Sequence, residues 1–135
     1  MKRHDLVAVA KQLLSFGLIG VIGFVVDAGV LYAALACGLG LYLGRLVSYL
    51  VAVSATWVLN RRYTFVARPG VSRIREWTKF VVSQLLGASI NLGVYALLVR
   101  TSPMVAQHPV IGVGAGSLSG LLVNFSVARA YVFYR

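Results

Sequence analysis

Residues 13–36 read LLSFGLIGVIGFVVDAGVLYAALA, a long apolar run that a single acidic residue, Asp27, interrupts. A helix needs about 20 apolar residues to cross the roughly 30 Å of hydrocarbon in a bilayer, so this run is long enough to span it. Three more apolar runs follow, at about residues 41–59, 80–99 and 110–128. The sequence therefore predicts an all-α integral membrane fold with four transmembrane helices.

The composition agrees with a membrane protein. Of the 135 residues, 59% are hydrophobic and 12% are charged, against about 25% charged in a typical soluble domain. The mean hydropathy is +0.85. The chain has 13 Lys and Arg against 3 Asp and Glu. These basic residues lie between apolar runs instead of on one water-facing surface, so we expect no nucleic-acid partner.

The connections between the runs differ in charge. Gly38 and Gly40 predict a tight turn, and two prolines mark residues 100–109 as a short link. Residues 60–79 are polar and basic and contain a Pro-Gly pair, so we expect a loop there. Basic residues gather before the first run, in this middle loop and after the fourth run, and the positive-inside bias then places both termini and the loop in the cytoplasm. They are Lys2, Arg3, Lys11, Arg61, Arg62, Arg68, Arg73, Arg75, Lys79, Arg129 and Arg135.

The second half of the chain partly repeats the first at an offset of 64 residues. The motif Arg-x-Tyr-x-Phe also occurs twice, at residues 61–65 and 129–133. We therefore expect a single domain over residues 1–135, built from two helical hairpins of the same orientation, at about 13–65 and 77–133. The matches at that offset include Phe16 with Phe80, Gly23 with Gly87, Asp27 with Asn91, and Asn60 with Asn124.

Small or polar residues recur at every fourth position in the second helix of each hairpin. Such stripes let helix backbones approach closely in lipid. They favour either packing within the bundle or a face for a second copy or a partner protein, and the sequence does not separate the two. The stripes are Gly44, Ser48, Ala52, Thr56 and Asn60, and Gly112, Gly116, Gly120 and Asn124.

Asp27 is an acid near the predicted middle of the first span. A charge at that depth costs on the order of 3 kcal/mol, so we expect Asp27 to face the interior beside a partner. One interpretation is a polar path, in which Asp27 and Asn91 contact a substrate and Gln84 adds hydrogen bonds, or in which Asp27 takes up a proton. The other is a structural pair with Arg45, or with Ser48 and Tyr49.

A second candidate site lies at the predicted cytoplasmic ends of the hairpins. Arginine side chains there can hold a phosphate through paired donors, or can simply anchor the ends to anionic lipid. Amphipathic aromatic residues suit the headgroup zone. The polar candidates are Asn60, Arg61, Arg62, Asn124 and Arg129, and the interfacial aromatic candidates are Tyr63, Phe65, Tyr131 and Phe133.

The sequence contains no catalytic motif. It has no Gly-x-Ser-x-Gly, no phosphate-binding loop and no paired carboxylates. It has one cysteine, and its two histidines are far apart in sequence. We therefore expect no enzymatic activity, no metal and no cofactor.

Three motifs together resemble the GtrA-like family of small four-span bacterial membrane proteins. They are Phe16-x-x-x-Gly20-x-x-Gly23 with Asp27, residues 60–65 (NRRYTF), and Asn124-Phe125 followed by residues 129–133 (RAYVF). The resemblance covers about residues 13–135. Tyr63 and Tyr131 stand where the family pattern has tryptophan, which keeps an amphipathic aromatic residue at both positions.

The resemblance implies translocation of a polyprenyl-phosphate-linked sugar across the bacterial cytoplasmic membrane, for the synthesis of cell-surface polysaccharide. It implies a glycosyltransferase as partner, and Asp27, Asn60, Arg61, Asn124 and Arg129 as residues to test. Because four helices enclose little interior, we expect a homodimer or a complex with that transferase.

Two other functions stay open on the sequence. A membrane anchor that recruits a polyprenyl-phosphate glycosyltransferase would need the spans but no polar path. A small multidrug-type, proton-coupled exporter also has four spans and one acid in the first. The motif set and the basic cytoplasmic ends count against the exporter.

Overall fold

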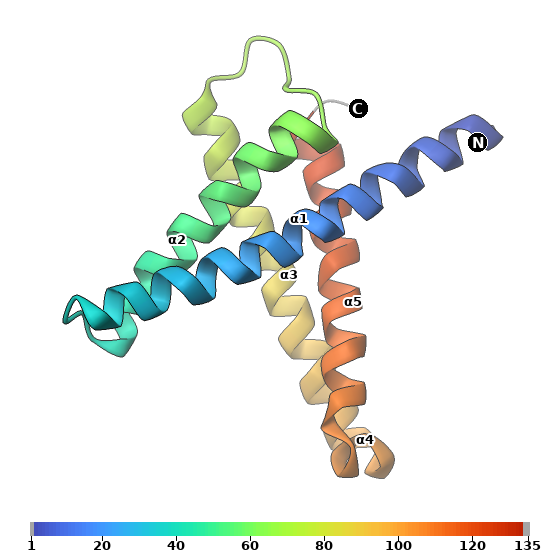
Figure 1. The fold of residues 1–135 in the computed structure, drawn as a ribbon. Helices are drawn as coiled ribbons and strands as arrows, with labels where there is room; N and C mark the ends of the chain where they lie inside the picture. Colours follow the sequence, from blue (N-terminus) through green and yellow to red (C-terminus); the bar gives the residue numbers. More distant parts are fainter. Residues whose placement is uncertain (1, 134–135) are drawn as a thin grey trace. The chain divides into compact units, whose positions relative to one another are not determined.

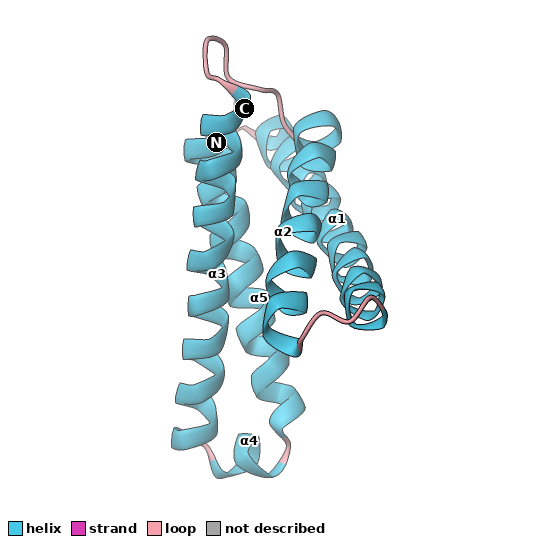
Figure 2. Cartoon of the chain, turned by 90° about the vertical axis from the view of Figure 1, so that its left-hand side faces the viewer, coloured by secondary structure: helices cyan, strands magenta, loops and turns pink. Residues whose placement is uncertain are grey.

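The computed structural model describes residues 2–133, whose regular elements are all helices (Figure 1, Figure 2). Four of them are long and apolar enough to cross a membrane, which confirms the predicted all-α fold with four spans. In chain order the elements are α1 (Arg3–Ala36), α2 (Leu41–Leu59), the π-helix η1 (Asn60–Thr64), α3 (Arg73–Thr101), the short α4 (Pro103–Gln107), α5 (Pro109–Val127) and the π-helix η2 (Ala128–Val132).

The helices pack as two separate units. In the first, α1 packs along α2 and η1, and Phe133 joins this unit. The second unit is Ser72–Val132, in which α3 packs along α5. In both units the second long helix runs into a π-helix, so the order of elements repeats. An origin of the two halves by duplication stays a prediction.

The apolar runs locate the spans but not the helix ends. The prediction of a loop over residues 60–79 is wrong at both ends, because 60–64 form η1 and 73–79 begin α3. The Phe65 N–H donates to the Asn60 carbonyl at 2.9 Å, which closes the π-turn. The Ser72 hydroxyl accepts from the Arg75 N–H at 3.3 Å and caps the start of α3. Residues 65–72 lie between η1 and α3.

Two further boundaries differ from the sequence expectation. The predicted link at 100–109 contains α4, which starts with Pro103 after the capping residue Ser102. Helix α1 begins at Arg3, well before the apolar run, where the Asp5 carboxylate accepts a hydrogen bond from the Lys2 N–H at 3.0 Å and caps the helix. Arg135, one of the basic residues used to orient the chain, lies outside the described residues.

The stripe of small and polar residues along α2 faces α1. Ser48 is completely buried and Ala52 is nearly so. Gly44 lies against the side chain of Leu31, and the methyl group of Thr56 fills the space that a side chain at Gly23 would need. The stripe is therefore the packing surface of the first helix pair.

The corresponding stripe along α5 packs against α3. A Cβ atom added at Gly116 would lie 2.5 Å from the carbonyl oxygen of Asn91, and one added at Gly120 would lie 2.8 Å from the carbonyl oxygen of Gly87. The backbones of α3 and α5 can approach this closely because glycine has no side chain. Of the two interpretations of the stripes, packing within a helix pair is the one the structure supports.

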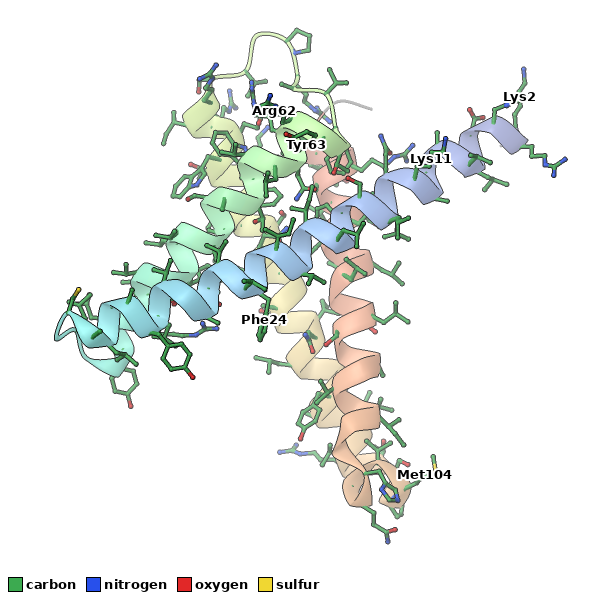
Figure 3. All side chains as sticks on the ribbon, viewed as in Figure 1. Lys2, Lys11, Phe24, Arg62, Tyr63 and Met104 are labelled. Carbon is green, nitrogen blue, oxygen red and sulfur yellow. The ribbon has the colours of Figure 1, made fainter. Side chains whose placement is uncertain are left out.

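Large apolar side chains cover the outside of both units. Phe24 on α1 is 73% exposed and Met104 on α4 is 60% exposed (Figure 3). In water such a surface would aggregate, whereas lipid chains solvate it. The distribution agrees with a multi-pass membrane protein.

The glycine packing gives a stability prediction. The substitution Gly116→Ala would force the α3 backbone away from α5, and overpacking of this kind costs about 1–3 kcal/mol. Gly114 lies on the same helix with nothing within 4 Å of an added Cβ atom, so Gly114→Ala is the matched control. We expect Gly116→Ala to lower the free energy of unfolding in detergent, measured by SDS titration. Equal stability of the two variants would contradict this packing.

Candidate functional site

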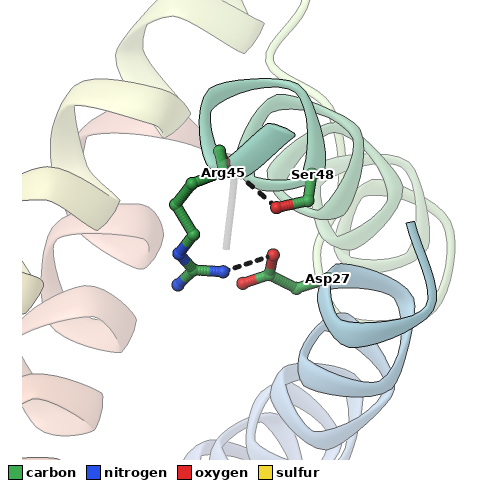
Figure 4. Close-up of polar contacts among 3 residues, drawn as sticks. All are labelled: Asp27, Arg45 and Ser48. Carbon is green, nitrogen blue, oxygen red and sulfur yellow. Dashed lines mark hydrogen bonds and ion pairs between the residues drawn. The ribbon is translucent and has the colours of Figure 1, made fainter. Parts of the chain in front are cut away.

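Asp27 and Arg45 form an ion pair between α1 and α2 (Figure 4). The Arg45 Nη1 atom donates to Asp27 Oδ1 at 2.6 Å. The Asp27 side chain is 16% exposed and the Arg45 side chain 58% exposed. Of the partners considered for Asp27, the structure therefore selects Arg45. The pair cancels two charges that would each be costly in hydrocarbon.

The position of the ion pair along the two helices follows from their bounds. Arg45 is four residues after the start of α2, which places it about 6 Å along the helix axis. Asn60 is fifteen residues further, or about 22 Å along the axis. Asp27 is nine residues before the end of α1, or about 14 Å along its axis, and its depth in a membrane stays a prediction.

Ser48 and Tyr49, the polar residues near the ion pair, form no hydrogen bond with the Asp27 side chain within the described residues. The Ser48 hydroxyl donates to the backbone carbonyl of Arg45 at 3.0 Å, not to Asp27 (Figure 4). The hydroxyl of Tyr49 is buried and has no hydrogen-bond partner within residues 2–133. The other N–H groups of the Arg45 guanidinium likewise have no partner in that range. The site thus keeps donors for a further group.

In the second unit, the candidates Asn91 and Asn124 lie at the contact between α3 and α5. The Asn124 side chain occupies the space above Gly87, and Asn91 lies against Gly116 and Gly120. The Asn124 Oδ1 atom is buried without a hydrogen-bond partner in the described chain. The same is true of the Gln84 Nε2 atom. Such atoms cost free energy unless a ligand or water satisfies them.

Several candidate residues of the predicted cytoplasmic site lie together at the end of α2. Asn60 is 1% exposed, and its Oδ1 atom has no partner within the described residues. Thr64 and Ser15 share a hydrogen bond of 2.7 Å, which fixes η1 against α1. The exposed Arg62 guanidinium lies 5.5 Å from the ring centre of Tyr63, a cation–π contact. Arg61 lies on the same π-helix.

The four predicted interfacial aromatic residues divide into two kinds. Tyr63 and Tyr131 are 64% and 68% exposed, in keeping with anchors at the headgroup level. Phe65 and Phe133 are buried, and their rings stack at 5.0 Å with 7° between the planes. Phe16 adds an edge-to-face contact to Phe65 at 6.1 Å. Phe65 and Phe133 are therefore packing residues of the first unit, and their place at the membrane interface stays a prediction.

Two polar residues of this region were not among the candidates. Arg68 Nε donates to the carbonyl oxygen of Phe133 at 3.1 Å and holds the last described residue in place. Glu76, in the first turn of α3, is 1% exposed. The sequence offered one reason to consider Glu76, which is that the chain contains only three acidic residues. Nothing in the sequence pointed to the contact of Arg68.

The chain was compared with known protein families and with curated proteins. A family profile described as "GtrA/DPMS, transmembrane domain" matches residues 15–133. No curated protein matches the chain.

The ion pair predicts a strong coupling between its two residues. Asp27→Ala leaves Arg45 without its partner, and Arg45→Ala leaves the carboxylate alone, so each should lower the free energy of unfolding by about 1–3 kcal/mol. The double variant removes both charges and should cost less than the sum of the single variants. Unfolding in detergent measures all three free energies. Arg100→Ala, an exposed charge at the end of α3, serves as control and should change stability by less than about 0.5 kcal/mol. Additive effects of Asp27→Ala and Arg45→Ala would contradict the pairing.

Proposed function

The chain belongs to the GtrA/DPMS transmembrane-domain family, and on this premise we propose that it moves a polyprenyl-phosphate-linked sugar across the bacterial cytoplasmic membrane. The transported sugar would serve the synthesis or modification of cell-surface polysaccharide. The observation that carries the proposal is the family match over residues 15–133, which includes part of the first candidate span and all of the other three.

The chemistry of the substrate explains why a protein is needed. A lipid-linked sugar has an anionic phosphate and several hydroxyl groups, and both are costly to move through hydrocarbon without hydrogen bonds. The prenyl chain, in contrast, is apolar and is solvated by the hydrocarbon of the bilayer. A translocator must therefore supply cationic groups for the phosphate and neutral polar groups for the sugar.

Cationic groups occur near both ends of α2. Arg61 and Arg62 follow the helix directly, at the end predicted to be cytoplasmic, and suit capture of the phosphate. Arg45 lies about 22 Å along the axis from Asn60, near the other end. Its guanidinium N–H groups that have no partner within residues 2–133 supply a second position for the phosphate, while Asp27 holds the side chain in place. Arg129 on η2 is the proposed counterpart in the second unit.

Neutral polar groups with unused hydrogen-bonding atoms supply the sugar contacts in this proposal. Each lies in a membrane-spanning helix or at its end, and each would gain a partner when a sugar hydroxyl arrives. Asn91 is included as the counterpart of Asp27 in the second half. The others are Tyr49, Asn60, Gln84 and Asn124.

The structure bears on one of the two alternative functions, the exporter, and leaves the anchor to be tested. The structure gives Asp27 a cationic partner, and a proton-coupled exporter of cations would have to displace it, so the ion pair counts against that function. A membrane anchor for a polyprenyl-phosphate glycosyltransferase needs no polar groups at all, and it is decided by the experiment below. A homodimer or a complex with that transferase remains part of the proposal.

The proposal predicts that the purified protein, reconstituted in liposomes, speeds the movement of a radiolabelled polyprenyl-phosphoryl hexose between leaflets. Oxidation by impermeant periodate measures the outward-facing share. We expect Asp27→Asn to slow the movement by about tenfold, the factor produced by 1.4 kcal/mol in a barrier. Asp5→Asn removes an exposed carboxylate from the start of α1 and should leave the rate unchanged.

Each outcome separates the functions. A rate no higher than in protein-free liposomes, together with co-purification of a glycosyltransferase, would support the anchor and overturn translocation. Equal rates for Asp27→Asn and the wild type would remove Asp27 from the path. Efflux of a cationic dye that depends on a proton gradient and on Asp27 would favour the exporter.

A further inference from the structure

A groove of about 390 Å³ runs along the outside of the first unit. Helix α1 forms one wall with Leu14, Leu18 and Ile22, and Leu59 at the end of α2 contributes to the other. Lys11 and Tyr63 also line the groove, at the end where η1 begins. The groove is thus apolar along its length and cationic at one end.

The dimensions of the groove fit one leaflet of a membrane. Between Lys11 and Ile22, α1 advances about 16 Å, which is roughly half the thickness of the hydrocarbon core. A chain whose headgroup lies beside Lys11 would therefore reach the middle of the bilayer along this groove.

The charged end of the groove suits a phosphate. Lys11 supplies one ammonium group, and Arg62 lies over the ring of Tyr63, which itself lines the groove. Figure 3 shows Lys11 on α1 and both Arg62 and Tyr63 at the end of the α2 segment. No acid lines the groove within the described residues, so nothing there would repel an anion.

We propose that this groove holds the first part of the prenyl chain of a polyprenyl-phosphate lipid, with Lys11 and Arg62 binding its phosphate. The inference rests on the proposed function and locates the substrate within it. A single apolar groove takes the single chain of a polyprenyl phosphate, whereas a common phospholipid would bring two chains. The sugar then lies beyond the phosphate, and the hairpin holds the lipid in one leaflet before the sugar moves.

Photocrosslinking tests the placement in the wild-type protein. A polyprenyl phosphate with a diazirine near the phosphate end of its chain is bound in detergent, irradiated and mapped by peptide mass spectrometry. We expect labels within residues 11–22 and 59–63. Labels confined to α3 and α5 would overturn the proposal.

Matched variants test the affinity for the same polyprenyl phosphate. Leu18→Trp fills the groove, while Val21→Trp places the same side chain at a similarly exposed position of α1 that does not line it. Lys11→Gln removes the ammonium group, and Arg3→Gln is its control outside the groove. We expect the dissociation constant to rise about tenfold for Leu18→Trp and Lys11→Gln and to change less than about twofold for the two controls, since tenfold corresponds to 1.4 kcal/mol.

Two further arms separate failure of the groove from failure of the function. Phosphatidylglycerol that competes as well as unlabelled polyprenyl phosphate would make the groove a general lipid site and overturn the proposal. If the wild type moves the lipid-linked sugar but Leu18→Trp and Lys11→Gln bind like their controls, only the groove is wrong. A wild type that neither binds nor moves the lipid would overturn the proposed function and the groove with it. Circular dichroism and size-exclusion profiles establish that the variants are folded.

Discussion

The close approach of two helix backbones within each unit is the constraint on which the other features depend. Lipid chains are as apolar as leucine, so no hydrophobic force draws membrane helices together, and van der Waals contact between backbones has to do so. The glycines along α5 meet carbonyl groups of α3 directly, and Thr56 on α2 fills the space left by Gly23 on α1. Larger side chains at these positions would separate the helices and remove the contact that replaces the hydrophobic effect.

This packing decides where a polar substrate can be bound. At Gly23, Gly87, Gly116 and Gly120 the neighbouring helix fills the space beside the glycine, so no part of a substrate fits at those points. The side-chain atoms of Asn60, Gln84 and Asn124 that have no hydrogen-bond partner within residues 2–133 are buried, whereas Arg45 is 58% exposed beside its partner. The apolar groove of the first unit is likewise on its outer surface. Under the proposed function, the prenyl chain would therefore lie on the outside of the first helix pair.

Hydropathy and spacing predict the spans, the packing stripes and Arg45 as a partner for Asp27, because each follows from the cost of exposing a group to lipid. The residues 41–59 predicted for the second span are the bounds of α2. The failures have a different cause. Hydropathy does not report where a helix ends in water, so the beginnings of α1 and α3 were missed. The burial of Phe65 and Phe133 depends on a contact between residues far apart in sequence, which their amphipathic setting does not reveal. Glu76 was missed because it stands among basic residues that suggest an exposed segment.

The distribution of acids explains why the ends of this protein should attract anionic lipids. The chain has three acids: Asp5 accepts a hydrogen bond at the start of α1, Asp27 holds Arg45, and Glu76 is buried in α3. Even if each acid neutralised one basic residue, ten of the 13 Lys and Arg would have no acid in the chain to pair with. Paired arginines and lysines at the membrane surface bind phosphate through charge-assisted hydrogen bonds, and the headgroup region supplies phosphate at high local concentration. Charge alone therefore gives affinity for any anionic lipid. Selection of one lipid must come from groups that recognise its chain or its headgroup, and the groups proposed here are the groove beside Lys11 and the amide and hydroxyl groups that have no hydrogen-bond partner within residues 2–133.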